Sequence, residues 1–261
     1  MEARSANARA RPSAPVPAFA LPVFTTMART PVPAARCSRQ TCTGAAQKRF
    51  RFEEALVTQL VLGRRRRARQ AEGATARTGG VGNVLAAFDA RLPFELTAGQ
   101  TAVGKEIDHD LAQPHPMNRL LQGEVGSGKT LVALRAMLRV VDSGGQAALL
   151  APTEVLAQQH YRSIAAMLGD LGEGGTIFGS GEGTRVELLT GSMGKAQRTG
   201  PLSRIASGEA GIVIGTHALL QDQVMFADLG LVVVDEQHRF GVEQRSALTE
   251  KSGGTPPHVL V

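Results

Sequence analysis

The sequence carries a glycine-rich segment whose residue types suit phosphate binding. Residues 123–130 match the pattern G-x-x-x-x-G-K-[ST]. Gly126 and Gly128 allow backbone shapes that a Cβ would block, so successive N–H groups can point at one anion. Lys129 offers a positive charge to the β- and γ-phosphates, and the Thr130 hydroxyl is a ligand for Mg²⁺. These features predict an ATP–Mg²⁺ site whose nucleotide-binding residues are Gly123, Glu124, Val125, Gly126, Ser127, Gly128, Lys129 and Thr130.

A second group of chemically active residues follows an apolar run farther along the chain. Asp235 and Glu236 come directly after residues 231–234, which are all apolar, as a strand buried on both faces requires. A carboxylate at that position suits a Walker-B role, so Asp235 is the expected second Mg²⁺ residue. Glu236 can orient or activate an attacking water. We therefore expect Glu236 and Lys129 to be the catalytic residues.

These residues need a scaffold, and the pattern after residue 93 supplies one. Short apolar runs alternate with helical stretches, which predicts βαβ units and a parallel sheet with helices on both faces, an α/β fold. Residues 172–183 hold six glycines and predict an exposed loop. The expected strands are 119–121, 147–150, 186–189, 211–214 and 231–234, and the expected helices are 129–141, 154–168 and 195–206.

Charge is distributed unevenly along the 261 residues. Residues 1–92 hold 16 Lys and Arg against 5 Asp and Glu, a net charge of +11, and the remainder carries −5. Residues 1–45 are rich in Ala, Pro and Arg, which predicts a disordered leader. Residues 46–92 are expected to hold a linker helix and a basic loop, and the globular domain to fill residues 93–261.

Within residues 46–92 two stretches differ in composition. Apolar positions from Phe52 to Val61 have helical spacing and run into Arg64–Arg67 and Arg69. This basic cluster either contacts nucleic-acid phosphate or is a solvated face. Residues 71–83 contain four glycines and predict a loose linker.

Composition also excludes several classes of protein. Cys37 and Cys42 lack the partners of a zinc site or a disulfide framework, which fits a reducing compartment, and we expect a cytoplasmic location. No apolar run approaches 18 residues, so no membrane partner is expected. Prolines at 15, 17 and 22 interrupt the apolar stretch near the N-terminus, which argues against a signal peptide.

With both segments in place, the sequence resembles superfamily-two helicases and, among them, the RecG family of branch-migrating DNA helicases. The resemblance runs from about Arg49 to Val261 and implies a RecA-like motor domain. The segment Leu92–Gln100 resembles the one by which this family recognises adenine, which implies that Gln100 hydrogen-bonds the base. The family also implies that Gln237 and His238 couple ATP turnover to DNA.

Three further segments resemble the family's DNA-contact loops. They are residues 151–160, 189–192 and 214–220, each at the carboxyl end of an expected strand, where open α/β sheets bind ligands. The implied partner is branched or single-stranded DNA, contacted without sequence preference in repair and recombination. The residues implied to contact DNA are Pro152, Thr153, Glu154, Gly191, Gly215, Thr216 and His217.

Departures from the family pattern leave alternatives open. The transcription-repair coupling factor shares the layout but reads Asp-Glu-Glu-Gln where this chain reads Asp-Glu-Gln-His at 235–238, which favours the RecG type. Residues 1–45 do not resemble the family's DNA-junction wedge domain, and the second RecA-like domain has no counterpart here. We therefore expect a fragment, truncated at its C-terminus and inactive as a helicase. The alternatives are a small intact ATPase, a DNA-binding module that works through its basic leader, or a non-functional truncated product.

Overall fold

The structure, a computed structural model, describes residues 39–80, 83–173, 183–235, 247, 251–252 and 255–261. Residues 1–38 of the expected leader and most of the expected loop at 172–183 lie outside these ranges. Residue contacts divide the chain into two units, Met1–Ala55 and Leu56–Val261. Helix α1, Arg39–Ala71, contains the division, and the sheet with its covering helices belongs to the second unit. The domain boundaries expected at residues 45 and 92 remain predictions.

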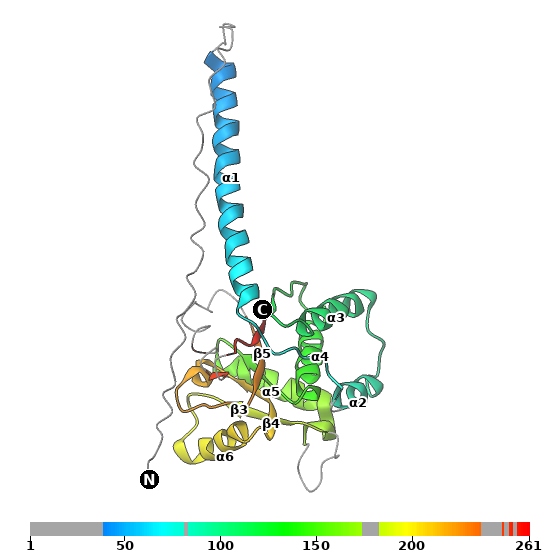
Figure 1. Cartoon of the computed structure of the whole chain (residues 1–261). Helices are drawn as coiled ribbons and strands as arrows, with labels where there is room; N and C mark the ends of the chain where they lie inside the picture. Colours follow the sequence, from blue (N-terminus) through cyan, green and yellow to red (C-terminus); the bar gives the residue numbers. More distant parts are fainter. Residues whose placement is uncertain (1–38, 81–82, 174–182, 236–246, 248–250, 253–254) are drawn as a thin grey trace, which may run out of the picture. The chain divides into compact units, whose positions relative to one another are not determined.

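Six parallel strands form the sheet of the described region, in the order β1-β6-β5-β2-β4-β3 (Figure 1). The predicted α/β fold with a parallel sheet is confirmed, and each of the five expected strands lies at its predicted place. The strands are β1 Asn118–Arg119, β2 Gln146–Leu150, β3 Arg185–Leu189, β4 Ala210–Gly215, β5 Leu229–Val234 and β6 His258–Leu260.

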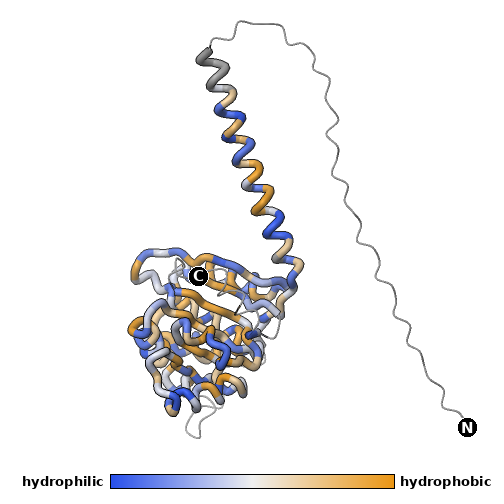
Figure 2. The backbone as a smooth tube through the Cα atoms, turned by 90° about the vertical axis from the view of Figure 1, so that its left-hand side faces the viewer, coloured by the Kyte–Doolittle hydropathy of each residue, from blue (hydrophilic) through white to orange (hydrophobic). Residues whose placement is uncertain are grey.

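The central strands bury side chains on both of their faces. On β5, Leu231 and Val233 belong to one core cluster, whereas Val232 and Val234 belong to the other. Ala147 and Ala148 of β2 divide between the two clusters in the same way. Successive strand residues point to opposite faces, so an apolar run without alternation fills both cores. Figure 2 shows this concentration of hydrophobic residues in the body of the protein.

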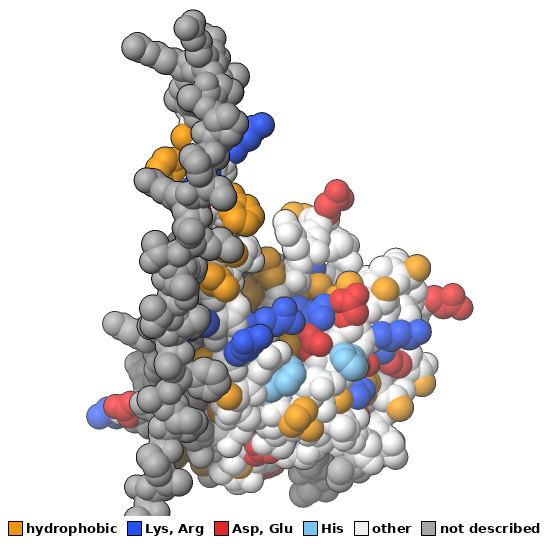
Figure 3. Space-filling view, turned by 45° about the horizontal axis from the view of Figure 1, so that its top comes forward, with side chains coloured by type: hydrophobic (Ala, Val, Ile, Leu, Met, Phe, Trp, Pro, Cys, Tyr) orange, Lys and Arg blue, Asp and Glu red, His pale blue; other side chains and the backbone are white. Residues whose placement is uncertain are grey.

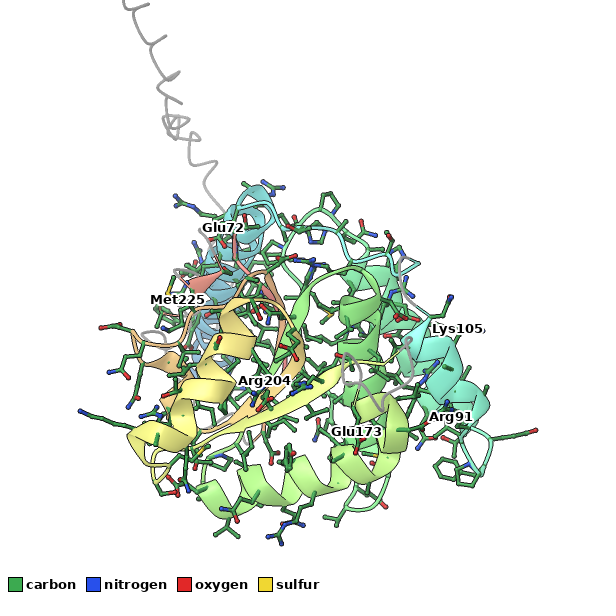
Figure 4. The ribbon with its side chains drawn as sticks, turned by 90° about the horizontal axis from the view of Figure 1, so that it is seen from below. Glu72, Arg91, Lys105, Glu173, Arg204 and Met225 are labelled. Atoms are coloured by element: carbon green, nitrogen blue, oxygen red, sulfur yellow. The ribbon has the colours of Figure 1, made fainter. Side chains whose placement is uncertain are left out.

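Helices cover both faces of this sheet. One core cluster contains buried residues of α2 Val84–Ala90, α3 Ala98–Leu111, α4 Lys129–Asp142 and α5 Glu154–Leu168. The other contains Ile205 of α6 Lys195–Ala206 and Leu219 of the 3-10 turn η2 His217–Leu220. Another 3-10 turn, η1 Gly169–Gly172, follows α5. Arg204, labelled in Figure 4, pairs with Glu187 of β3 and ties α6 to the sheet.

The expectation of a loose linker at residues 71–83 is wrong for the part that is described. Arg77 is only 3% exposed and forms two hydrogen bonds, of 2.6 and 2.7 Å, with the carboxylate of Asp228. The Arg77 N–H donates to the carbonyl of Leu111, and the Gly79 N–H donates to the Ser143 hydroxyl. The buried Arg77 guanidinium needs a charged partner, and Asp228 supplies it. Together with the backbone hydrogen bonds, this ion pair holds the segment against the body.

No helix in the described ranges is long and apolar enough to cross a membrane.

Candidate nucleotide and nucleic-acid site

The glycine-rich segment forms the loop between β1 and α4. Gly126 and Gly128 have φ angles of 82° and 81°, in the left-handed region that glycine adopts without strain. Helix α4 begins at Lys129, directly after Gly128. The first N–H groups of a helix have no partners within it and carry its positive dipole end, so an anion is favoured at this point. Val125, at the tip of the loop, is fully exposed.

Lys129 points back into the loop that precedes it. Its Nζ donates hydrogen bonds of 2.8 Å to the carbonyl oxygens of Gly123 and Glu124. A Cβ at Gly123 would lie 2.7 Å from the Ser127 hydroxyl, so a larger residue there would force Ser127 to shift. The ammonium is therefore held inside the curve of the loop, beside the amino end of α4 where phosphates bind.

Gln100 lies against the same loop. Its Nε2 donates a 3.0 Å hydrogen bond to the Ser127 carbonyl, and a Cβ on Gly128 would collide with this amide. A capping box fixes the side chain, because Gln100 Oε1 accepts from the Thr97 N–H while the Thr97 hydroxyl accepts from the Gln100 N–H. The sequence assigned Gln100 to adenine, and here it is positioned next to the phosphate loop.

An open cleft of about 490 Å³ lies beside this cap. Its lining includes Leu92, Phe94 and Leu96 from the segment before α3, and Thr101 from α3 itself. Phe94 is 56% exposed, which is unusual for an aromatic side chain in a folded body. The cleft therefore offers an apolar wall within a few residues of Gln100.

Asp235 stands at the carboxyl end of β5. Its N–H donates to the Leu150 carbonyl at 2.9 Å, and its Oδ2 lies 2.9 Å from Nε2 of His160 on α5. The side chain of Asp235 is 39% exposed, whereas that of His160 is 20% exposed. One carboxylate oxygen is thus held by an imidazole from a helix 75 residues earlier in the sequence. The sequence predicts only a DNA-contact segment at residues 151–160, so sequence reasoning missed the contact between His160 and Asp235.

The three loops assigned to DNA meet at Glu154, the first residue of α5. Its Oε1 accepts a 2.8 Å hydrogen bond from the Ser192 N–H and lies close to Gly191. Hydrogen bonds from the Ser192 hydroxyl and backbone, with a smaller effect from His217, hold the pKa of this carboxyl below its ordinary value. The loops after β2, β3 and β4 therefore form one surface.

Side-chain caps fix two of these loops, those after β2 and β4. The Thr153 hydroxyl accepts a hydrogen bond from the Leu156 N–H and so caps the amino end of α5. Pro152 immediately precedes this cap. The Thr216 hydroxyl accepts from the Ala218 N–H, and this residue is only 1% exposed. Gly215 is needed because a Cβ would collide with the Leu189 carbonyl. His217 is exposed here, whereas the Thr216 side chain is buried.

Three predicted site residues, Glu236, Gln237 and His238, lie outside the described residues.

A glycine loop that joins a parallel strand to a helix, followed by an acidic residue at the end of a second strand, defines the P-loop class of nucleotide-binding proteins. The chain belongs to the DEAD/DEAH box helicase family, which it matches over residues 97–258. The resemblance to RecG helicases is also confirmed. The chain is 54% identical over 217 residues to the ATP-dependent DNA helicase RecG of Mycobacterium tuberculosis and 44% identical over 215 residues to that of Bacillus subtilis.

These matches cover most of this chain but a minor part of each relative. The M. tuberculosis match covers 83% of this chain and 29% of the relative, and the B. subtilis match covers 82% and 30%. A solved structure of RecG bound to a three-way DNA junction superimposes with a TM-score of 0.68 at 37% identity. That alignment covers 83% of this chain and 27% of the other, and it agrees with a RecA-like motor domain.

Proposed function

We propose that this chain is the ATP-binding motor domain of a RecG-type DNA helicase that acts on branched DNA in repair and recombination. The observation that carries the proposal is the phosphate loop, with Lys129 curled into it and Gln100 bonded to it, in a chain similar to RecG helicases. The relatives named above are all RecG helicases, which favours this type over the coupling-factor type.

The residues of the loop fit a nucleoside triphosphate. The Lys129 ammonium would exchange its two carbonyl partners for phosphate oxygens, which are stronger acceptors because they are charged. Gln100 Nε2 donates to the phosphate loop, and Gln100 Oε1 accepts from the N-cap residue of α3. Gln100 therefore links α3, where the base would bind, to the loop before α4, where the phosphates would bind. Phe94 and Leu96 offer the adjacent apolar surface for the base.

Two oxygen donors among the predicted site residues suit a hard divalent cation. We assign the Thr130 hydroxyl and the Asp235 carboxylate to Mg²⁺, because hydroxyl and carboxylate oxygens are its preferred protein ligands. Bound with the nucleotide, Mg²⁺ would neutralise phosphate charge. Glu236 is assigned as the base that accepts a proton from the attacking water, with Gln237 and His238 in the coupling of turnover to DNA.

The surface around Glu154 is assigned to the DNA strand. Pro152 and Thr153 lead into α5, which begins at Glu154, and Gly191 and the segment Gly215–His217 lie next to them. Such loops offer backbone amides and hydroxyls, which contact phosphates without reading bases. The expected interaction is therefore independent of DNA sequence.

Turnover by these 261 residues alone should be very slow. Two-domain motors hold ATP between RecA-like domains, and an arginine from the second domain stabilises the transition state by a factor on the order of 10³–10⁵ in rate. The chain aligns with 29% of a RecG relative, and we propose that the second domain belongs to the part not covered. Stepping along DNA requires both domains to move relative to each other.

Replacement of Lys129 by Ala tests the assignment. The substitution removes a charge-assisted contact to phosphate worth about 1.5–3 kcal/mol, so ATP affinity should fall about ten- to a hundredfold. Lys195→Ala is the matched control, because Lys195 is likewise the first residue of a helix and likewise follows a glycine. Titration with a fluorescent ATP analogue measures both variants. Equal affinity in Lys129→Ala and the parent protein would overturn the phosphate-loop assignment.

DNA-stimulated ATPase activity separates the proposal from a self-sufficient ATPase. The chain should bind ATP with weak hydrolysis that branched DNA hardly accelerates. Strong stimulation would show a complete active site and contradict the need for a second domain.

A further inference from the structure

A second cleft, of about 440 Å³, lies at the amino end of β1. One wall comes from the last turns of α1, and the other comes from the end of α3, the segment that follows it and the start of β1. Both walls belong to the unit that begins at Leu56. The lining includes Leu62, Arg65, Arg66, Asp110, His115 and Asn118.

Helical periodicity explains which arginines of the basic cluster reach this cleft. Leu62, Arg65 and Arg66 are three and four residues apart, a spacing that places them on one face of α1. Arg64 and Arg67 belong to the same run but fall outside that face, and neither lines the cleft. Two adjacent guanidinium groups are thus directed into the cleft, while their neighbours in sequence are directed elsewhere.

The charge balance in the cleft is positive. Among the described residues, no acidic side chain forms an ion pair with Arg65 or Arg66. Asp110 is the acidic residue in the lining, and its carboxylate is held by Arg119 at 2.7 Å. Figure 3 shows one face of the body, on which Lys and Arg side chains lie beside Asp, Glu and His side chains. The two guanidinium groups are therefore available to an anion from outside.

We propose that this cleft binds the sugar–phosphate backbone of DNA, with Arg65 and Arg66 on phosphate oxygens and Asn118 and His115 on the opposite wall. Guanidinium groups bind phosphate through paired, charge-assisted hydrogen bonds. Among the described residues, the lining includes no Phe, Tyr or Trp for base stacking, so contacts there position the strand and do not read its sequence. The identity of the occupant as DNA rests on the proposed function.

A polymeric anion fits the site better than a free phosphate. Arg64 and Arg67 extend the positive charge of the run beyond the cleft, and this field attracts a polyanion more strongly than a single phosphate without requiring a contact. The cleft is also separate from the surface around Glu154. It precedes the edge strand β1, whereas the loops of that surface follow the carboxyl ends of β2, β3 and β4. A branched DNA has several arms, so it can contact both surfaces.

Two double variants with the same change in charge test this proposal. Arg65→Gln/Arg66→Gln removes the two cleft arginines, and Arg64→Gln/Arg67→Gln removes two arginines of the same run that do not line the cleft. Binding of a fluorescent three-way junction is measured from low to moderate salt. The cleft variant should bind about tenfold more weakly and lower the salt slope by about two, whereas the control should lose about threefold or less.

Each outcome has a defined meaning. Equal losses in the two double variants would show diffuse charge attraction and overturn the cleft as a site. An unchanged DNA affinity in the cleft variant, together with weaker binding of pyrophosphate, would show a small-anion site and overturn DNA as the occupant. Both double variants should retain the parental ATP affinity, since neither pair touches the phosphate loop. Failure of Lys129→Ala to weaken ATP binding would instead remove the proposed function and leave the DNA measurement interpretable.

Discussion

At the scale of single residues, the contact between His160 and Asp235 has a direct chemical consequence. Asp235 Oδ2 accepts from the imidazole Nε2, and this leaves Oδ1 for water or a metal ion. A carboxylate held by a neighbouring donor keeps one orientation, and such partners sustain metal affinity. His160 lies on the helix that begins at Glu154, so one rigid element joins the proposed DNA surface to the proposed Mg²⁺ residue.

Loss of this contact should change the Mg²⁺ requirement of ATP binding. In His160→Ala the Asp235 side chain is free to rotate, so the Mg²⁺ concentration for half-maximal ATP binding should rise about tenfold. His160→Gln keeps an N–H donor and should recover part of the difference. Affinity for ATP in the absence of Mg²⁺ should be the same in all three proteins. An identical Mg²⁺ requirement in His160→Ala and the parent would remove the positioning role.

The sequence could not reveal this pair, whereas it did reveal the phosphate loop. Gly126, Gly128 and Lys129 act within a few residues, so their spacing records the geometry directly. His160 and Asp235 are 75 residues apart and meet only because the sheet order brings β5 beside β2. Local chemistry is legible in a single sequence, but contacts set by topology are not.

At the scale of elements, the helices and strands that could be predicted are those with a clear pattern of apolar residues in the sequence. Helices α4, α5 and α6 and five strands were predicted within a few residues of their observed bounds. Helices α2 and α3 were missed. Helix α2 has only seven residues, and α3 contains Gly99 and Gly104, which weaken a helical pattern. The capping box of Thr97 and Gln100, with apolar residues at 103, 107 and 111, could have identified α3.

Gly128 lies where the phosphate loop meets Gln100 of α3, and two separate features of the structure favour glycine there. Gly126 and Gly128 share a left-handed φ, so alanine at either position should cost about 1–2 kcal/mol in backbone strain. Only Gly128 also faces the Gln100 amide, since a Cβ at Gly126 would meet open space. Gly126 is therefore a matched control for strain alone.

Gly128→Ala should weaken ATP binding more than Gly126→Ala does. The additional Cβ displaces Gln100 from the Ser127 carbonyl, which separates the proposed adenine residue from the loop. We expect a further loss of about three- to tenfold in affinity, the equivalent of one neutral hydrogen bond. Gln100→Ala should reduce the difference between the two glycine variants. Equal affinities in those two variants, measured by titration with a fluorescent nucleotide, would contradict this role of Gln100.

At the scale of the whole molecule, residues far apart in sequence close the edge of the sheet. His258 on β6 accepts a 3.1 Å hydrogen bond at Nδ1 from the Met117 N–H, and its Nε2 lies 3.0 Å from the Thr75 carbonyl. Arg77 joins the same segment to Asp228 beside β5. Glycine content predicted a loose linker, because composition reports local freedom and cannot report partners 151 and 183 residues away.

This closure makes the stability of the fold sensitive to acid through His258. Burial lowers the pKa of His258, and Arg77 and His115 lower it further, whereas the Thr75 carbonyl and Asp110 oppose the shift. Protonation would also place an N–H at Nδ1 opposite the Met117 N–H. A folded-state pKa below the unfolded value of 6.5 means that the unfolded chain binds the proton first. The stabilisation is therefore complete above pH 6.5 and is lost as pH falls through the lowered pKa.

His258→Asn tests the consequence. The Asn oxygen can accept from the Met117 N–H but does not titrate, so the variant should lose less stability between pH 7 and pH 5 than the parent does. The difference is at most about 1.4 kcal/mol per pH unit, the limit for one proton. His109→Asn, at an exposed position on α3, is the control and should follow the parent. Urea unfolding at each pH measures the free energies, and parallel pH profiles for His258→Asn and the parent would exclude His258 as the titrating group.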